Sequence, residues 1–410
     1  MIENKDKKQW IAIENWIYAV IRPNQLLLYN TRTGQYMISQ ESEHVSIVAK
    51  MHEKKNLGVI LFEEDWFENQ KILSFIEEAV EKNIFTLEDY REDGLKPIRL
   101  MPVLNIQKDV ERMKRNPDRS AGESSLSYLT ELSLYVNDSC PLHCKHCGQL
   151  NKQFMCCGRD KDDFSLDAGV LAKIAAQIKY APIMKLNILG GDIFSYPLLD
   201  KIPEIFSDKK EQLHFWSHYK NFQAPNFDAV WEIVVDLPVD EQVLSYCVSE
   251  SIKQKTQYNY HFIIQNEEEV NLVEKIINKL DIQTFEMHPC YSGENIDFFE
   301  SCIFLNKEDI FGDTISQRRI FCNQALNSNF FGSLTVFSNG DVAAQVNVPV
   351  LGNISTDSLL ELITRELEQN TAWRKVRNVP PCNDCLFQYL CPPVSSYEAV
   401  FKRENLCALY

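Results

Sequence analysis

The sequence predicts an α/β protein whose central domain is a parallel sheet or a partial (βα)6 barrel. Three observations predict it. Six strand-like segments alternate with helix-like segments between about residue 131 and residue 287. The helix-like segments place apolar residues on one face, as at Leu171, Ile174 and Ile178. Hydrophobic residues make up 45% of the 410 residues, which excludes a disordered chain.

Each element of this central domain has its own local signal. Ser165 and Asp240 are the predicted N-caps of two helices, a third begins near Pro197, and a fourth covers 267–280. The predicted strands are 132–136, 184–189, 213–217, 231–236, 260–264 and 282–287.

The segments on either side of this domain have different patterns. Before it we expect a strand over 10–21, a hairpin over 26–38, a helix over 43–52, a strand over 57–62 and a helix capped by Asp65. After it we expect a hairpin over 334–342 and a helix over 356–370. The predicted domains are therefore 1–95, a connector 96–128, 129–300 and 301–410.

Charge and composition exclude several classes of function. The net charge of −16 argues against broad nucleic-acid binding, which needs a basic surface. No apolar run approaches the ~18 residues of a membrane span. The N-terminus lacks a secretory signal, so we expect a cytoplasmic protein. In a reducing compartment, the 13 cysteines suggest metal binding or redox chemistry rather than disulfides.

Three cysteines follow the first predicted strand of the central domain. Cys140, Cys144 and Cys147 form a C-x3-C-x2-C loop. Three thiolates on one tight loop can hold three irons of a [4Fe-4S] cluster and leave the fourth iron open. The alternative is a zinc site completed by His143 or His146.

Two further groups lie at predicted strand ends. Gly190, Gly191 and Asp192 end the second strand, and Asp236 ends the fourth. Strand ends are where ligands collect in parallel α/β folds. Taken alone, either group also fits an ordinary turn.

A second set of cysteines lies near the C-terminus. Cys382, Cys385, Cys391 and Cys407 have the spacing C-x2-C-x5-C-x15-C in a turn-rich segment. Four thiolates at these spacings can enclose one iron–sulfur cluster or one zinc ion.

The C-x3-C-x2-C loop after the first strand resembles the signature of radical S-adenosylmethionine (radical SAM) enzymes. That resemblance implies Cys140, Cys144 and Cys147 as the catalytic set, with SAM bound to the open iron through its amino and carboxylate groups. It implies that Gly190, Gly191 and Asp192 match the family's Gly-Gly-Glu motif. In that motif the acid receives the amino group of SAM. Asp236 matches a polar cofactor-binding position of many relatives.

The C-terminal cysteines resemble the SPASM extension of radical enzymes that modify peptides. The full extension holds two auxiliary clusters, but Gln345 and Ser395 stand where two of its cysteines are expected. The resemblance therefore implies one auxiliary iron–sulfur cluster in a SPASM/twitch-like domain, with zinc as the alternative.

The whole chain looks like a Bacteroidales-type group of radical SAM/SPASM proteins that accompany ribosomal peptide modification. Its segments 104–112 and 186–194 carry this likeness. The N-terminal domain resembles the winged-helix element that binds a leader peptide as an added strand. The resemblance implies a ribosomal precursor peptide as partner, with a companion maturase and an electron donor.

Two hypotheses of function follow. In the first, the chain is an enzyme that cleaves SAM, abstracts hydrogen from the precursor peptide and installs a thioether or carbon–carbon crosslink. In the second, it is a non-catalytic pseudo-radical-SAM partner that binds the peptide for another maturase. Three departures from the family pattern favour the second hypothesis: Asp192 in place of Glu, His146 where an aromatic residue is common, and the half-lost SPASM cysteine set. The intact three-cysteine loop favours the first.

Overall fold

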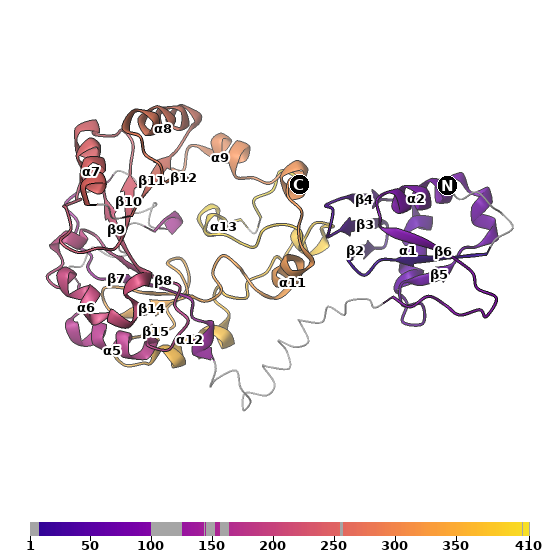
Figure 1. The fold of residues 1–410 in the computed structure, drawn as a ribbon, viewed down its shortest axis with the longest axis horizontal. Helices are drawn as coiled ribbons and strands as arrows, with labels where there is room; N and C mark the ends of the chain where they lie inside the picture. Colours follow the sequence, from indigo (N-terminus) through magenta and orange to yellow (C-terminus); the bar gives the residue numbers. More distant parts are fainter. Residues whose placement is uncertain are drawn as a thin grey trace.

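The computed structural model describes residues 8–99, 125–142, 144, 152–155, 164–254, 257–403 and 405–409. Within them the chain forms two parts (Figure 1). The N-terminal unit, residues 8–99, contains two three-stranded sheets. The larger body, from residue 125 onward, is built on a nine-stranded sheet.

The N-terminal unit packs its two sheets and two helices around one apolar core. Its sheets are antiparallel, with strand orders β5-β1-β6 and β2-β3-β4. The elements are β1 (Gln9–Ile13), β2 (Ile17–Arg22), β3 (Gln25–Asn30), β4 (Tyr36–Ser39), α1 (Ser42–His52), β5 (Val59–Leu61), α2 (Gln70–Glu81) and β6 (Phe85–Asp89).

Two local expectations for this unit are wrong, and one strand was not predicted. The single strand expected over 10–21 is broken by a turn, where Ile17 N donates to Glu14 O over 3.1 Å. Asn69, not Asp65, caps α2, because residues 64–68 form a separate 3-10 helix. The sequence also gave no expectation of β6, which completes the sheet beside β1.

The nine-stranded sheet has the order β12-β11-β10-β9-β8-β7-β13-β14-β15. Strands β7 to β12 are parallel and neighbours in chain order, which confirms a mixed α/β fold with a large parallel sheet. Closure into a partial barrel stays a prediction. The parallel strands are β7 (Glu131–Tyr135), β8 (Lys185–Leu189), β9 (Leu213–His218), β10 (Val230–Val235), β11 (Tyr258–Ile264) and β12 (Phe285–Pro289).

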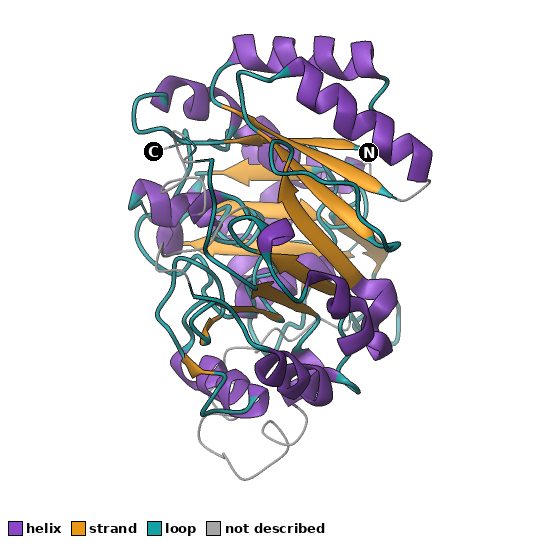
Figure 2. Ribbon diagram, turned by 90° about the vertical axis from the view of Figure 1, so that its left-hand side faces the viewer, coloured by secondary structure: helices purple, strands orange, loops and turns teal. Residues whose placement is uncertain are grey.

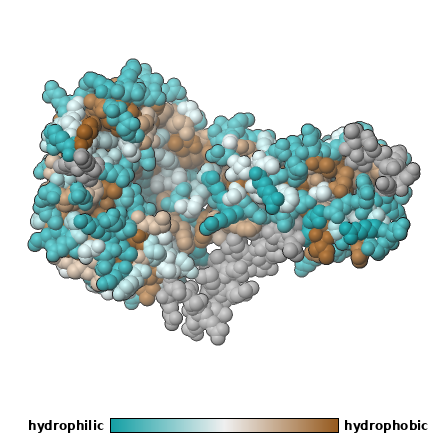
Figure 3. All heavy atoms as spheres, in the orientation of Figure 1, coloured by the Kyte–Doolittle hydropathy of each residue, from teal (hydrophilic) through white to brown (hydrophobic). Residues whose placement is uncertain are grey.

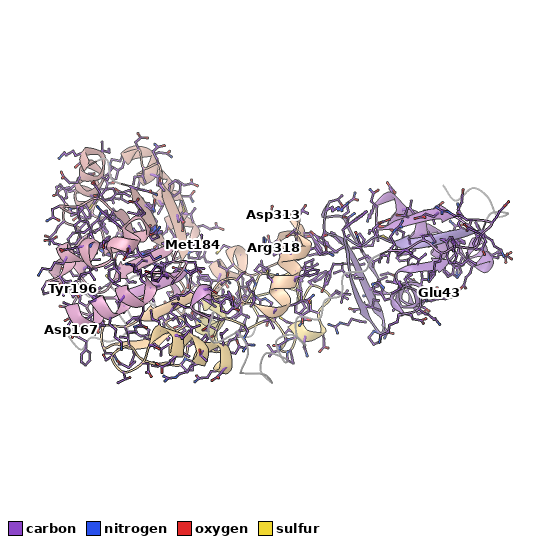
Figure 4. The ribbon with its side chains drawn as sticks, turned by 60° about the horizontal axis from the view of Figure 1, so that its bottom comes forward. Glu43, Asp167, Met184, Tyr196, Asp313 and Arg318 are labelled. Carbon is purple, nitrogen blue, oxygen red and sulfur yellow. The ribbon has the colours of Figure 1, made fainter. Side chains whose placement is uncertain are left out.

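Helices cover the outer side of this sheet, whereas α13 lies on its other side (Figures 1 and 2). Asp167, labelled in Figure 4, caps α5 by accepting from Val170 N over 2.9 Å, so the expected cap at Ser165 is wrong. Asp240 caps α7 as expected. The covering helices are α5 (Ala168–Ile178), α6 (Ile202–Ile205), α7 (Glu241–Gln254) and α8 (Glu267–Leu280).

The C-terminal segment adds to the same sheet. Strand β13 pairs parallel with β7 and antiparallel with β14, which confirms the expected hairpin. The expected helix over 356–370 is also present, as α12. The elements are α9 (Ile296–Cys302), α10 (Lys307–Phe311), α11 (Gln317–Ala325), β13 (Ser333–Val336), β14 (Asp341–Ala343), β15 (Gly352–Asn353), α12 (Leu359–Gln369) and α13 (Ser396–Phe401).

An apolar cluster joins the N-terminal unit to the C-terminal segment. Leu27 and Tyr29 of β3 pack with Ile315, Ile320 and Leu390. This contact places α11 between the N-terminal unit and the sheet, as the labels of Asp313 and Arg318 show in Figure 4.

The surface in view is mostly hydrophilic, with hydrophobic side chains in scattered positions (Figure 3). Within the described part of the chain, no helix has both the length and the apolar character needed to cross a membrane.

Candidate active site

The loop with the first cysteines leaves the carboxyl end of β7. Residues 137–139 connect this strand to Cys140, and Cys144 follows on the same loop. Both cysteines are partly buried. The Asn221 amide, from the segment after β9, lies 3.7 Å from Cys140 Sγ and donates to it. Cys147, His143 and His146 lie outside the described residues.

The Gly190-Gly191 turn, at the end of β8, packs directly on the residues before Cys140. Gly191 N donates to Asn137 O over 3.0 Å, and Asp192 N donates to Ser139 O over 2.6 Å. A Cβ on Gly191 would overlap the Ser139 carbonyl, and one on Gly190 would overlap Asn137. Two glycines are needed here because the two backbones touch. The structure thus brings the Gly-Gly-Asp motif to the cysteine loop.

The Asp192 side chain caps a short helical turn. Its Oδ1 accepts from Phe194 N over 3.1 Å. Burial raises the pKa of this carboxyl, and the backbone N–H groups of Phe194 and Ser195 partly offset that rise. The carboxylate is therefore held by its own turn at the edge of the site.

Asp236 lies beside the cysteine loop, just after β10. Its carboxylate pairs with His218 Nε2 at 3.1 Å and with Lys220 Nζ at 3.3 Å. Burial opposes the charge on Asp236, but His218 and Lys220 outweigh it and lower the pKa. Ligand atoms of Cys144, His218 and Asp236 lie within 4.8 Å of one another. The strand ends therefore bring Asp236 and one loop cysteine together.

Sequence reasoning missed His218 and Asn221. Both follow from β9, where a polar residue at the strand end was the available signal. A single histidine or asparagine near a strand end is too common to identify a site residue from the sequence.

A cavity of about 480 Å³ lies along the inward-facing side chains of the parallel strands. Glu232 of β10 is nearly inaccessible, with 2% of its surface exposed, and is the centre of a polar network in the cavity wall. It accepts from His214 Nδ1 at 2.7 Å and Asn259 Nδ2 at 3.0 Å, and it pairs with His261 Nε2 at 2.8 Å and Lys185 Nζ at 3.3 Å. Burial opposes the Glu232 charge, but these donors outweigh it and hold its pKa well below the usual range.

The cavity also contains aromatic groups. Phe154 packs its ring against His288, with centroids 4.0 Å apart, and Trp216 stacks on His261 at 4.7 Å. Burial, with the neighbouring His261, lowers the pKa of His288 to about 4, so this imidazole is neutral at pH 7. A cavity lined by charged groups, aromatic rings and a neutral imidazole can hold a polar side chain of a peptide.

The C-terminal cysteines are brought together by the fold. Cys382, Cys385, Cys391 and Cys407 line one small enclosed cavity together with Arg377. Burial raises the pKa of Cys391 to about 12, partly offset by Arg377. Buried thiols of this kind deprotonate readily only when a metal cation replaces the proton on the sulfur.

The backbone around these cysteines is arranged to support sulfur ligands. Phe387 N donates to Cys385 Sγ and Leu409 N donates to Cys407 Sγ, each over 3.3 Å. The buried Arg377 is fixed by Glu398 at 2.6 Å. Backbone N–H groups and one guanidinium facing sulfur stabilise negative charge on it. The donor set fits either an iron–sulfur cluster or zinc.

No family model matches the chain, and no curated protein matches it. Among the solved structures that the chain resembles are crystal structures of Streptococcus suis SuiB. Against SuiB alone, identity is 12% and the TM-score 0.47, covering 97% of this chain and 100% of that one. The TM-score is 0.44 against SuiB bound to S-adenosylmethionine and 0.41 against SuiB bound to precursor peptide SuiA. Both are also 12% identical and cover 97% of this chain and 98% of that one. A likeness this distant assigns neither a fold family nor a function to this chain.

Proposed function

We propose that the chain is a radical SAM peptide maturase, with its [4Fe-4S] cluster held by Cys140, Cys144 and Cys147. The observation that carries the proposal is the packing of the Gly190-Gly191 turn onto the residues before Cys140. The close backbone contact explains why both positions are glycine, and it makes the motif part of the cysteine-loop site rather than an isolated turn. The C-x3-C-x2-C spacing supplies the chemistry.

The residues around the loop fit this cofactor. When bound and reduced, the cluster supplies the electron that cleaves SAM to the 5′-deoxyadenosyl radical. The Asn221 amide donates toward Cys140 Sγ and so stabilises the thiolate form. Asp236, held charged by His218 and Lys220, offers a carboxylate to the cationic or hydroxylated parts of SAM. The cavity beside the strands receives the peptide side chain that reacts.

The leader of the precursor peptide binds, in this proposal, along β4 of the N-terminal unit. Strand β4 is an edge strand of its sheet and has a strand neighbour on only one side among the described residues. A groove of about 360 Å³ runs beside it, lined by residues of β4, α1 and α2 that include Ile38, Lys71 and Phe75. An added strand can pair with the free edge and place alternate side chains in the groove.

The C-terminal cysteines bind one auxiliary iron–sulfur cluster in the same proposal. Held by Cys382, Cys385, Cys391 and Cys407, such a cluster would supply an electron acceptor or a binding site for a substrate thiol. A zinc ion is the alternative for the same four sulfurs, since both groups accept four thiolates.

The second candidate is a non-catalytic partner that presents peptide to another maturase. The position of Asp192 favours it. Aspartate is one methylene shorter than the glutamate of the family motif, and its carboxylate is engaged by Phe194 N. The amino group of SAM would then lack its usual acceptor.

One experiment separates the two candidates. The protein is purified without oxygen, reconstituted with iron and sulfide, and assayed for 5′-deoxyadenosine from SAM under reduction. An active enzyme gives product that a Cys144→Ala variant loses and a Cys302→Ala variant, changed at an exposed cysteine, keeps. No product from a fully loaded protein contradicts the enzyme. About eight irons per chain indicate two four-iron clusters, and about four indicate one.

A further inference from the structure

Two histidines and a glutamate meet in the wall of the cavity, whose described lining contains no cysteine. Strands β11 and β12 pair in parallel, with His261 opposite Glu286 and Ile263 opposite His288. His261 Nδ1 lies 3.0 Å from His288 Nε2. Glu286 Oε2 lies 3.4 Å from His288 Nε2 and 3.9 Å from His261 Nδ1. Three possible ligand atoms therefore face one another across a single small space.

These separations match the coordination shell of one ion. Nitrogen and oxygen ligands lie about 2.0–2.2 Å from a zinc-type ion, so neighbouring ligand atoms are about 3–4 Å apart. All three measured separations fall in that range. Two imidazoles and one carboxylate are ligands that divalent transition metals accept.

Glu232 fixes the orientation that such a site needs. Its Oε2 lies 2.8 Å from His261 Nε2, so that ring nitrogen carries the proton and Nδ1 turns its lone pair toward His288. A carboxylate behind a histidine in this way is the usual support of a metal-bound imidazole. Glu232 is itself held by His214 and Asn259, so its position does not depend on an ion.

We propose that His261, Glu286 and His288 bind one divalent transition-metal ion of the zinc class in the cavity wall. All three residues line the 480 Å³ cavity, so the remaining coordination positions face it. A thiolate, imidazole or carboxylate of a bound molecule can then complete the shell. The proposal rests on this geometry and stands whether or not the chain is a radical enzyme.

The test is a cobalt titration of the full chain, freed of metal by chelation under reducing conditions. Cobalt also binds the cysteine groups, which give an intense thiolate-to-metal absorption band. We expect Glu286→Gln and His288→Ala each to take up one ion fewer per chain than wild type, or to bind that ion at least about tenfold more weakly. The thiolate band stays unchanged, because no cysteine is altered.

The exposed Glu274→Gln on α8 is the matched control and keeps the wild-type stoichiometry. Glu286 is 69% exposed, so its variant keeps the fold even if His288→Ala does not. Equal cobalt uptake by Glu286→Gln, His288→Ala and wild type, with the thiolate band intact, overturns the proposal. The histidines then form a simple hydrogen-bonded pair. If only His288→Ala loses the thiolate band, that variant has misfolded, and the Glu286→Gln titration alone decides.

Discussion

Glu232 illustrates at the residue scale how a buried charge is tolerated. Its carboxylate has four partners, and a neutral glutamine leaves Lys185 without its counterion and gives His214, His261 and Asn259 a weaker acceptor. Loss of one partner from a buried ion pair costs about 3–5 kcal/mol. We expect Glu232→Gln to lower the free energy of unfolding by about 3 kcal/mol, measured by urea denaturation at pH 7. The exposed Glu274→Gln should change it by less than about 0.5 kcal/mol.

The same substitution has a defined pH dependence. The pKa of Glu232 is lowered in the folded state, so its contribution is fully present above the unfolded value of about 4.3. The contribution is lost as the pH falls from there through the folded pKa. The stability gap between wild type and Glu232→Gln should therefore persist at pH 5 and shrink in stronger acid. A gap that closes between pH 7 and pH 5 would contradict the assignment.

The free edge of β4 is the feature to test at the element scale. Ile38 is 36% exposed and lines the groove beside β4. An aspartate there replaces an apolar side chain by a negative charge, in a groove that already contains the acidic Glu41 and Glu78. We expect Ile38→Asp to weaken leader binding about tenfold, or 1.4 kcal/mol. The measurement is fluorescence anisotropy with a labelled peptide encoded by the short open reading frame beside the gene.

Leu57→Asp is the matched control for this change. Leu57 is 57% exposed, lies outside the groove and has φ of 50°, a left-handed backbone that aspartate adopts readily. Equal weakening by both substitutions would argue against a binding site at β4.

Contacts between distant parts of the chain are tested best at the scale of the whole molecule. The buried Ile315 N–H donates to Tyr29 Oη over 2.7 Å and so links β3 to the segment before α11. Tyr29→Phe leaves this donor without its acceptor, which costs about 1–3 kcal/mol. We expect that loss in the free energy of unfolding, measured by chemical denaturation. Tyr246→Phe, at a half-exposed ring on α7, should have little effect.

Much of the fold could be predicted because its signals are local. The helix over 267–280 and the Asp240 cap were both predicted from the sequence, and both are present. The errors came from equally local signals that competed. Ser165 and Asp167 are both good N-caps, and only the backbone path decides which one caps α5. Strand β6 was missed because its stability comes from pairing with β1, about 75 residues away in the chain.

The candidate site divides in the same way. The cysteine spacings and the Gly-Gly-Asp motif could be singled out because each is a short run of residues. His218, Glu232 and the pair of His261 and His288 could not, because none of them belongs to a short run with a recognisable spacing. Their meaning depends on which residue lies opposite on the next strand.

The sequence by itself determined the alternation of strands and helices and the cysteine groups that carry the proposed chemistry. Tertiary structure decided that the Gly190-Gly191 turn touches the cysteine loop and that the C-terminal cysteines surround one cavity. It also decided that Glu232 has four partners and that three possible metal ligands meet. The physical reason is that local spacing fixes periodicity and turns, whereas the pairing of parallel strands far apart in the chain fixes which side chains meet.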